Sequence, residues 1–392
     1  MVNRQRRAFI KQGLTGLLLS SAPALYAQVF DSKENPLNYS NSHDVYEGWF
    51  SAQGSEPGKH GFATEFLYSQ SMEANKPVIG KSGFRGHGGA QHTLKPNCVL
   101  LFGRRPSTES IEINLLTAEV TNRFYSQPGY HFFGHGAFSH DGKYLYTSEA
   151  NLESNKGVIG IRDAKTYEWL GEFSSHGIGP HQLMVMPNGK QLVVANGGIL
   201  TRPETGRKKL NLDKMSSNLS YINIETGALD SQWFVPEPKA SIRHLDVAKD
   251  GTVALAMQVQ RQASGHKKQV SLAGIHKANR EIVLLEQQQV MNQMNDYIGS
   301  VAIHEASRTA GFTSPRGDIV GFWHLDTGEF KGFHTMKDVC GITVSNHLDS
   351  FIVTNSYGAV HYIDGFSLVE NIKLRKLFPN LYWDNHMVHI QS

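Results

Sequence analysis

Short apolar segments separated by glycine turns recur along most of this sequence. The clearest example is the segment 131–149, in which an apolar run reaches the turn Asp141-Gly142. Alternating apolar and small polar residues follow over 144–148. Asp-Gly between two such runs is a strong hairpin signal, because both turn positions tolerate positive φ. The pattern therefore predicts an antiparallel β-hairpin.

The same unit returns further along the chain. It recurs over 179–195, around the turn Asn188-Gly189, and over 242–257, around Asp250-Gly251. Six complete units can be placed between residue 86 and about residue 375, and their starts lie about 40 to 60 residues apart, which is the spacing of four-stranded propeller blades. Inside the third unit, the polar stretch 201–217 has the length of a functional or mobile loop.

The two ends of this array carry incomplete units that complement each other. Three short strands are predicted at 46–52, 61–68 and 76–81, and one opening strand at 383–390. Pairing the last strand with the first three makes a seventh blade and removes exposed sheet edges. We therefore predict an all-β fold, a seven-bladed β-propeller over residues 46–392. A β-sandwich or a two-domain arrangement is the alternative, but neither explains the complementary fragments.

Composition supports this architecture. The chain has 392 residues, of which 38 are glycine and only 19% are charged, and this suits a turn-rich β protein better than a helical one. The formal charge of +3 comes from the first 27 residues, because the remaining chain carries 34 basic and 35 acidic residues. A near-neutral protein offers no electrostatic basis for binding nucleic acid or an anionic membrane.

The amino-terminal segment has the features of an export signal. Residues 5–11 resemble the twin-arginine export motif, although Gln5 stands where Ser or Thr is usual. A short apolar region over 14–21 and small-residue cleavage sites follow. No stretch of the sequence is long enough and apolar enough to span a bilayer. These features predict a signal peptide over 1–27, a polar leader over 28–45 and a mature periplasmic protein. We expect this mature protein to be a monomer.

The chain has two cysteines, Cys98 and Cys340. An oxidising periplasm would allow them to form a disulfide. The repeat places them in blades that are not neighbours, so we predict two free thiols. Cys340 is expected to be accessible at the mouth of the central channel, and Cys98 to be buried within a strand.

One position of the repeat carries many side chains that can bind metal. The innermost strands of all blades run in the same direction, so residues at equivalent positions form a ring near one mouth of the channel. The predicted ring has a gap near Gly299 and contains His87, His135, His181, His244, Cys340 and His386. Imidazole and thiolate ligands suit copper, zinc or iron rather than calcium or magnesium. A single such histidine would be interpreted as structural, but five lone pairs at one point are costly to bury without protons, water or a metal.

Other polar residues are predicted near the ends of the same strands. Six of them are candidates for binding a cofactor or supporting the ring: Arg85, Glu149, Asn196, Arg243, Arg316 and Asp384. Carboxylates orient metal-bound imidazoles, so Asp384 and Glu149 are candidates for that role. Ordinary turn and surface polarity is the alternative interpretation. The sequence has no nucleophile elbow, phosphate-binding loop, zinc-protease motif or haem-attachment motif.

Several motifs resemble those of a bacterial family of exported propeller-like proteins, domain-of-unknown-function family 1513. They cover nearly the whole mature chain, at 86–89, 134–136, 157–160, 175–181, 195–198, 210–213, 241–244, 313–317, 338–341 and 383–386. The family has no established activity. Its genes are often found beside those of imelysin-like iron-uptake proteins and dihaem oxidoreductase-like proteins, which implies periplasmic iron-uptake proteins as partners. The ring also looks like the histidine-lined copper site of nitrous oxide reductase propellers, an analogy at the level of the fold.

Three functions are compatible with these observations. A metal-binding accessory protein of iron or copper uptake accounts for both the ring and the resemblance. A metal-dependent oxidoreductase or lactonase would use the same mouth for turnover. A scaffold for partner proteins would use its histidines only structurally. Metal content separates the third function from the first two, and a substrate or redox screen separates those two from each other.

Overall fold

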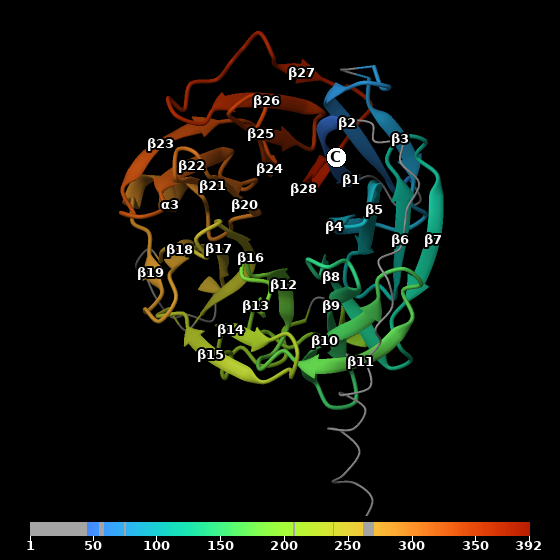
Figure 1. Cartoon of the computed structure of the whole chain (residues 1–392). Coiled ribbons are helices and arrows are strands. Elements are labelled where there is room, and N and C mark those ends of the chain that lie inside the picture. Colours follow the sequence, from blue (N-terminus) through green and yellow to red (C-terminus); the bar gives the residue numbers. More distant parts are fainter. Residues whose placement is uncertain (1–44, 55–58, 74–75, 207, 238, 262–269) are drawn as a thin grey trace, which may run out of the picture. The chain divides into compact units, whose positions relative to one another are not determined.

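The computed structural model describes residues 45–54, 59–73, 76–206, 208–237, 239–261 and 270–392. In this part of the chain, 28 strands form seven antiparallel sheets of four strands each. Figure 1 shows these sheets as blades around one axis. The predicted seven-bladed β-propeller is confirmed. The predicted signal peptide and all of the predicted leader except Val45 lie outside the described residues.

Six blades are formed by strands that follow one another along the chain, from the innermost to the outermost. Blade 1 contains β4 (Gly86–His92), β5 (Lys95–Gly103), β6 (Glu109–Asn114) and β7 (Val120–Tyr125). Blade 2 contains β8 (Tyr130–Phe138), β9 (Tyr144–Asn151), β10 (Lys156–Asp163) and β11 (Trp169–Ser174). Blade 3 contains β12 (Pro180–Val185), β13 (Gln191–Asn196), β14 (Asn218–Asn223) and β15 (Leu229–Phe234).

The next three blades repeat this order, and two of them have short outermost strands. Blade 4 contains β16 (Ala240–Val247), β17 (Val253–Val259), β18 (Ala273–His276) and β19 (Val283–Leu284). Blade 5 contains β20 (Ser300–His304), β21 (Thr309–Ser314), β22 (Ile319–His324) and β23 (Phe330–Thr335). Blade 6 contains β24 (Val339–Ser345), β25 (Ser350–Asn355), β26 (Ala359–Asp364) and β27 (Lys376–Leu377).

The seventh blade joins the two ends of the propeller. It contains, in this order, β28 (Trp383–Gln391), β1 (Tyr46–Gln53), β2 (Gly61–Ser69) and β3 (Val78–Lys81). β28 is antiparallel to β1 from Glu47 to Gln53. Trp383 of β28 also meets Trp49 of β1 edge-on, with ring centroids 4.7 Å apart. The last strand therefore closes the ring in the way that the complementary fragments predict.

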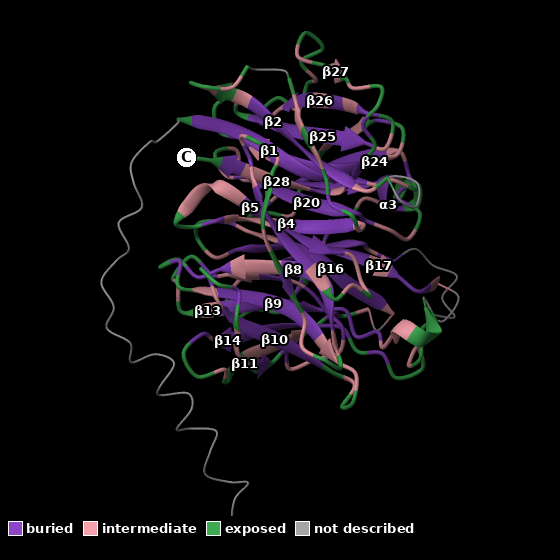
Figure 2. Ribbon diagram, turned by 90° about the vertical axis from the view of Figure 1, so that its right-hand side faces the viewer, coloured by how far each residue is buried: buried purple, intermediate pink, exposed green. Residues whose placement is uncertain are grey.

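The core lies between the faces of neighbouring blades. A middle strand is covered on both faces, and every residue of β1, β21 and β25 is buried. An outermost strand is covered on one face only, and exposure alternates along β23. Figure 2 shows the consequence, with most strands buried and exposed residues mainly in the connections. The sequence signal follows the same rule, because continuous apolar runs mark strands that are buried on both faces.

The innermost strands all begin at one face of the ring, which we call the upper face. Neighbouring strands in a blade are antiparallel, so the connections from second to third strands also lie at the upper face. One of them, between β13 and β14, contains the helix η1 (Pro203–Thr205). The helix α3 (Gln288–Gln293) precedes β20 at the same face. No helix in the described ranges has the length and apolar character needed to cross a membrane.

Candidate metal centre

Hydroxyl groups of second strands identify the equivalent residue of each innermost strand. Ser148 of β9 donates to the carbonyl oxygen of His135 in its own blade (3.1 Å) and to that of His181 in the next blade (2.9 Å). In the same way, the hydroxyl of Thr313 of β21 donates to the carbonyl oxygens of Ser300 (3.4 Å) and Cys340 (2.8 Å). Ser300 therefore occupies the ring position of blade 5, where sequence reasoning left a gap.

Most innermost strands are irregular at this position. Their pairing with the second strand shifts register next to or across the ring residue in β4, β8, β12, β16, β24 and β28. Only β20, which carries Ser300, pairs with its neighbour without such a shift. An extra residue in one strand bends it and re-aims side chains, and such bulges are common next to functional sites. The register shifts therefore give the ring side chains directions that a regular strand would not.

Two glycines let β4 and β8 approach each other closely. Gly134 has a φ of +104°, and a Cβ at this residue would lie 2.7 Å from Cδ2 of His87. A Cβ at Gly88 would lie 2.5 Å from Nδ1 of His135. Glycine avoids both the strain and the contacts. The Gly-His-Gly motifs of the sequence are thus explained by the packing of two imidazoles against neighbouring backbone.

Five imidazoles converge around the axis, and we call them the histidine cluster. Its members are His87, His135, His181, His244 and His386, and each is only 3–7% exposed. Nine of the ten pairs have ring centroids 4.1–5.9 Å apart. Nitrogens from four of the rings, all except His181, lie within 4.8 Å of one another. This spacing allows several imidazoles to reach one ion.

Burial keeps these imidazoles neutral. It is the largest cause that lowers the pKa of all five, and neighbouring imidazoles or arginines add to it. The pKa of His386 falls to about 3, with the charge of Arg104 as the second cause. The pKa values of the other four lie well below 6.5. At neutral pH each ring therefore offers one nitrogen lone pair, the form in which histidine binds metals.

Four nitrogens of the cluster are buried without a hydrogen-bond partner among the described residues. They are Nδ1 of His87 and His181 and Nε2 of His135 and His386. Buried polar atoms are normally paired, so each such atom needs an explanation. A cation among the rings would satisfy the lone pairs together.

Gln182 orients one member of the cluster. Its Oε1 accepts from the backbone N–H of Leu245 (3.2 Å) and lies 3.1 Å from Nδ1 of His244. An accepting oxygen requires the proton on Nδ1, which leaves the lone pair on Nε2 for a ligand. Ser300 Oγ lies 3.3 Å from Nδ1 of His386 and is placed for a similar role. Sequence reasoning missed Gln182, whose only signal is that it directly follows His181.

Cys340 has the ring position of blade 6, but the structure does not bring it into the cluster. Its Sγ lies 3.4–3.6 Å from the carbonyl oxygens of Trp383, Asp384 and Thr354. Burial raises its pKa well above the ordinary value, so the neutral thiol is favoured. Both cysteines are free, as predicted. The expected difference in accessibility is wrong, because Cys340 is 3% exposed whereas Cys98 is half-buried.

Two other sequence candidates bond to residues outside the histidine cluster. Glu149 pairs with Arg162, with 3.0 Å between Oε1 and Nη2, and both side chains are buried. Asn196 donates to the carbonyl oxygen of Ser175 (2.7 Å). Neither has a hydrogen bond to the histidine cluster among the described residues. Imidazole support comes instead from Gln182 and Ser300.

The remaining four candidates carry charge at the upper face. Arg85 and Asp384 form an ion pair (3.1 Å between Nε and Oδ2). Arg243 directly precedes His244 and is buried. The guanidinium of Arg316 lies 4.9 Å from the centroid of the Tyr297 ring. Arg85 and Asp384 therefore satisfy each other, whereas Arg243 and Arg316 have no carboxylate partner among the described residues.

A second group of metal-ligand residues lies on blades 5 and 6. Nε2 of His334 and Nδ1 of His361 are 3.1 Å apart, and Oε1 of Glu370 lies 3.1 Å from the same nitrogen of His361. Arg375 donates to both oxygens of Glu370 at 2.7 Å. Because these groups already pair with one another, we interpret them as an ion-pair network.

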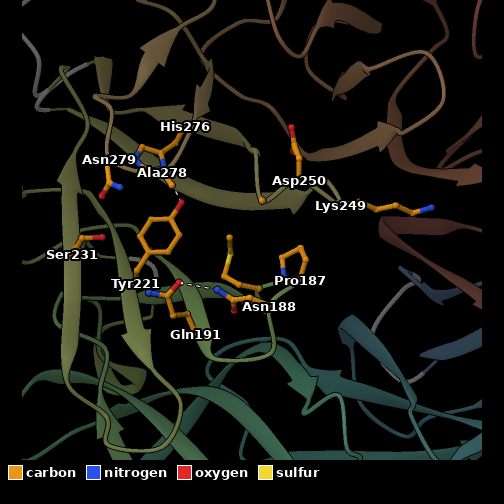
Figure 3. Close-up of a pocket in the computed structure, with 12 residues that line it drawn as sticks. Pro187, Asn188, Gln191, Tyr221, Ser231, Lys249, Asp250, His276, Ala278 and Asn279 are labelled. Atoms are coloured by element: carbon orange, nitrogen blue, oxygen red, sulfur yellow. Dashed lines mark hydrogen bonds between the residues drawn. The ribbon is translucent and has the colours of Figure 1, made fainter.

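A surface pocket lies away from the histidine cluster. It has a volume of about 360 Å³, and its lining residues include Asn188, Asp250, Tyr221 and His276. The turns between first and second strands lie at the lower face of the propeller, opposite the face at which the histidine cluster lies. Figure 3 shows Tyr221 pointing toward His276, and its hydroxyl lies 2.7 Å from Nδ1 of His276. None of the histidines of the cluster lines this pocket.

Comparisons with known proteins identify the family and the fold. The family described as "Protein of unknown function (DUF1513)" matches residues 82–390. None of the curated proteins compared with the chain matches it. Among solved structures, hydrazine synthase of Kuenenia stuttgartiensis is similar, with a TM-score of 0.55 and 12% identity over 88% of this chain and 99% of that chain. At this identity the likeness concerns the fold alone.

Proposed function

This chain belongs to the DUF1513 family, and we propose that it binds a transition metal, namely copper, zinc or iron, at the histidine cluster. The observation that carries the proposal is the convergence of five buried, neutral imidazoles, four of which have a nitrogen without a partner among the described residues. Imidazole nitrogen is a good ligand for these three metals, and copper binds such sites most tightly.

The proposed role is to hold metal rather than to turn over a substrate. Catalytic metal sites keep a coordination position open for water or substrate, and zinc enzymes typically use three protein ligands. Four imidazoles of this cluster have nitrogens within 4.8 Å of one another, enough to fill a four-coordinate site. Its rings are also nearly excluded from solvent. These features favour a binding or carrier protein over a metal-dependent oxidoreductase or lactonase.

We place this role in the periplasm, as an accessory to metal uptake. The support is the twin-arginine-like segment 5–11 of the sequence and the association implied by the family resemblance. The proposed partners are periplasmic iron-uptake proteins. Cys340 is left out of the proposed ligand set, because its Sγ contacts three carbonyl oxygens.

Equilibrium dialysis followed by elemental analysis tests the proposal. Metal-stripped protein dialysed at neutral pH against Cu²⁺, Zn²⁺ or Fe²⁺ should take up about one ion per chain, and Ca²⁺ and Mg²⁺ should not bind. The double variant His244→Gln/His386→Gln should lose this binding. Gln182→Ala should weaken it by about 10–100-fold, the usual effect of removing a group that orients a ligand.

His140→Gln provides the matched control, because His140 is exposed in the turn between β8 and β9. This variant should bind metal like the wild type. Absence of binding of all three ions by wild-type protein would contradict the proposal and favour the structural interpretation of the histidines.

A further inference from the structure

Positively charged side chains gather at the upper face beside the histidine cluster. The members of this cationic group are Arg104, Arg105, Lys209, Arg243 and Arg316. Arg104 follows β5, and its backbone N–H donates to the carbonyl oxygen of Arg85, the residue before β4 (2.9 Å). Lys209 belongs to the long connection between β13 and β14 and bonds Gln260, which follows β17. The group therefore comes from four blades. Arg104 and Arg105 belong to blade 1, Lys209 to blade 3, Arg243 to blade 4 and Arg316 to blade 5.

The positive charges of this group repel one another, and several of them influence the same neighbour, Tyr297. Burial lowers the pKa of Lys209, and repulsion by Arg243, Arg316 and Arg105 lowers it further. Burial raises the pKa of Tyr297, and the charges of Arg104, Arg243 and Arg316 oppose that effect. Asn385 directly precedes His386, and its Nδ2 donates to the Tyr297 hydroxyl (2.9 Å). Arg316, whose guanidinium lies 4.9 Å from the centroid of the Tyr297 ring, is thereby linked to the strand that carries His386.

Arg243 is the member that most requires a partner. It is only 5% exposed, and its Nε is buried without a hydrogen bond. Among the described residues it has no ion pair, although it lies at the buried start of the strand that carries His244. The nearby carboxylate, Asp384, is paired with Arg85 and accepts from the backbone N–H of Asn385. A buried, unpaired guanidinium is costly unless an anion accompanies it.

We propose that the cationic group binds a small oxyanion with two negative charges, a dicarboxylate or a phosphate, at Arg243 beside the histidine cluster. Guanidinium groups suit both chemistries, because their N–H donors match carboxylate and phosphate oxygens in pairs. The exposed Arg316 and Lys209 would attract the anion, and the buried Arg243 would hold it. The inference does not depend on a bound metal. If both sites exist, a metal complex of such an anion is the ligand that would use them together.

Calorimetric titration of metal-stripped protein tests the inference. Succinate and inorganic phosphate are titrated separately at low ionic strength, and at least one should bind with a stoichiometry of one per chain. The anion that binds more tightly identifies the class. Arg243→Gln should weaken binding at least about tenfold, as expected for a lost charge-assisted hydrogen bond. Arg316→Gln should also weaken it, and this exposed position keeps the test valid if the buried variant does not fold.

Two controls separate this inference from the proposed metal site. Arg280→Gln, at an exposed arginine between β18 and β19, should bind the anion like the wild type. The double variant His244→Gln/His386→Gln should also retain anion binding, even though it loses metal. In thermal unfolding, the bound anion should raise the melting temperature of wild type but not of Arg243→Gln. No binding of either anion at millimolar concentration, or binding that Arg243→Gln leaves unchanged, would overturn the inference.

Discussion

The metal-free protein should lose stability steeply as the pH falls below 6.5. In the folded state the pKa values of the five clustered histidines lie well below 6.5, chiefly because the rings are buried. In the unfolded state they return to about 6.5. Between the folded-state pKa values and 6.5, the unfolded chain therefore binds more protons than the folded protein. In this window the free energy of unfolding decreases as the pH is lowered.

The expected size of this effect is large. Each proton taken up on unfolding contributes about 1.4 kcal/mol per pH unit, so five histidines contribute up to about 7 kcal/mol per unit. A typical domain has a total stability of about 5–15 kcal/mol. The metal-free protein should therefore unfold within one or two pH units below 6.5. A bound metal excludes protons from the rings and should move this transition to lower pH.

Urea unfolding at a series of pH values from 7.5 to about 5 measures this slope. His135→Gln should reduce it by about one proton, or about 1.4 kcal/mol per pH unit. His140→Gln should leave it unchanged, because His140 is exposed in a turn. A free energy of unfolding that stays constant from pH 7 to 5 would show that the cluster is not buried in its neutral form.

Deletion of residues 381–392 should prevent the protein from folding into a stable monomer. The deletion removes β28, which pairs with β1 and buries Trp383 and Ile390. Blade 7 would retain three strands and expose the edge of β1, a site for aggregation. Loss of a buried tryptophan alone typically costs about 3–5 kcal/mol, and the deletion removes an entire strand in addition. Soluble yield and sedimentation velocity should report aggregated protein.

A pair of adjacent aromatic residues provides a milder version of this test. Trp383→Ala should lower the free energy of unfolding by about 3–5 kcal/mol. Tyr382→Ala should have little effect, because Tyr382 is 48% exposed. Equal melting temperatures of the full-length and truncated proteins would contradict the role of β28 in closing the ring.

The fold could be predicted from the sequence because its signals are local and repeated. Turns such as Asp141-Gly142 mark hairpins, and continuous apolar runs mark strands that are buried on both faces. The histidines of the cluster share one position in this repeat, so the prediction of the fold also brought them together. Closure of the ring followed from the two incomplete units at its ends, and β1 and β28 do pair.

The details of the site could not be predicted, because side-chain direction depends on the backbone at the register shifts. Cys340 has the same position in the repeat as His386, yet its Sγ contacts backbone carbonyls of blades 6 and 7. Gln182 supports His244 from the neighbouring blade, 62 residues away along the chain. Contacts of this kind leave no periodic signal. The sequence likewise does not show that Arg243 lacks an ion pair among the described residues, because this depends on which side chains surround it in the folded protein.

Anomalous X-ray diffraction from crystals of the metal-loaded protein tests the central claim most directly. Data collected at the absorption edge of the bound copper or zinc should give one peak on the propeller axis, among the five imidazoles. At least three histidine nitrogens should lie about 2.0–2.1 Å from that peak. A peak only at His334, His361 and Glu370, or no peak near the histidine cluster, would contradict the account.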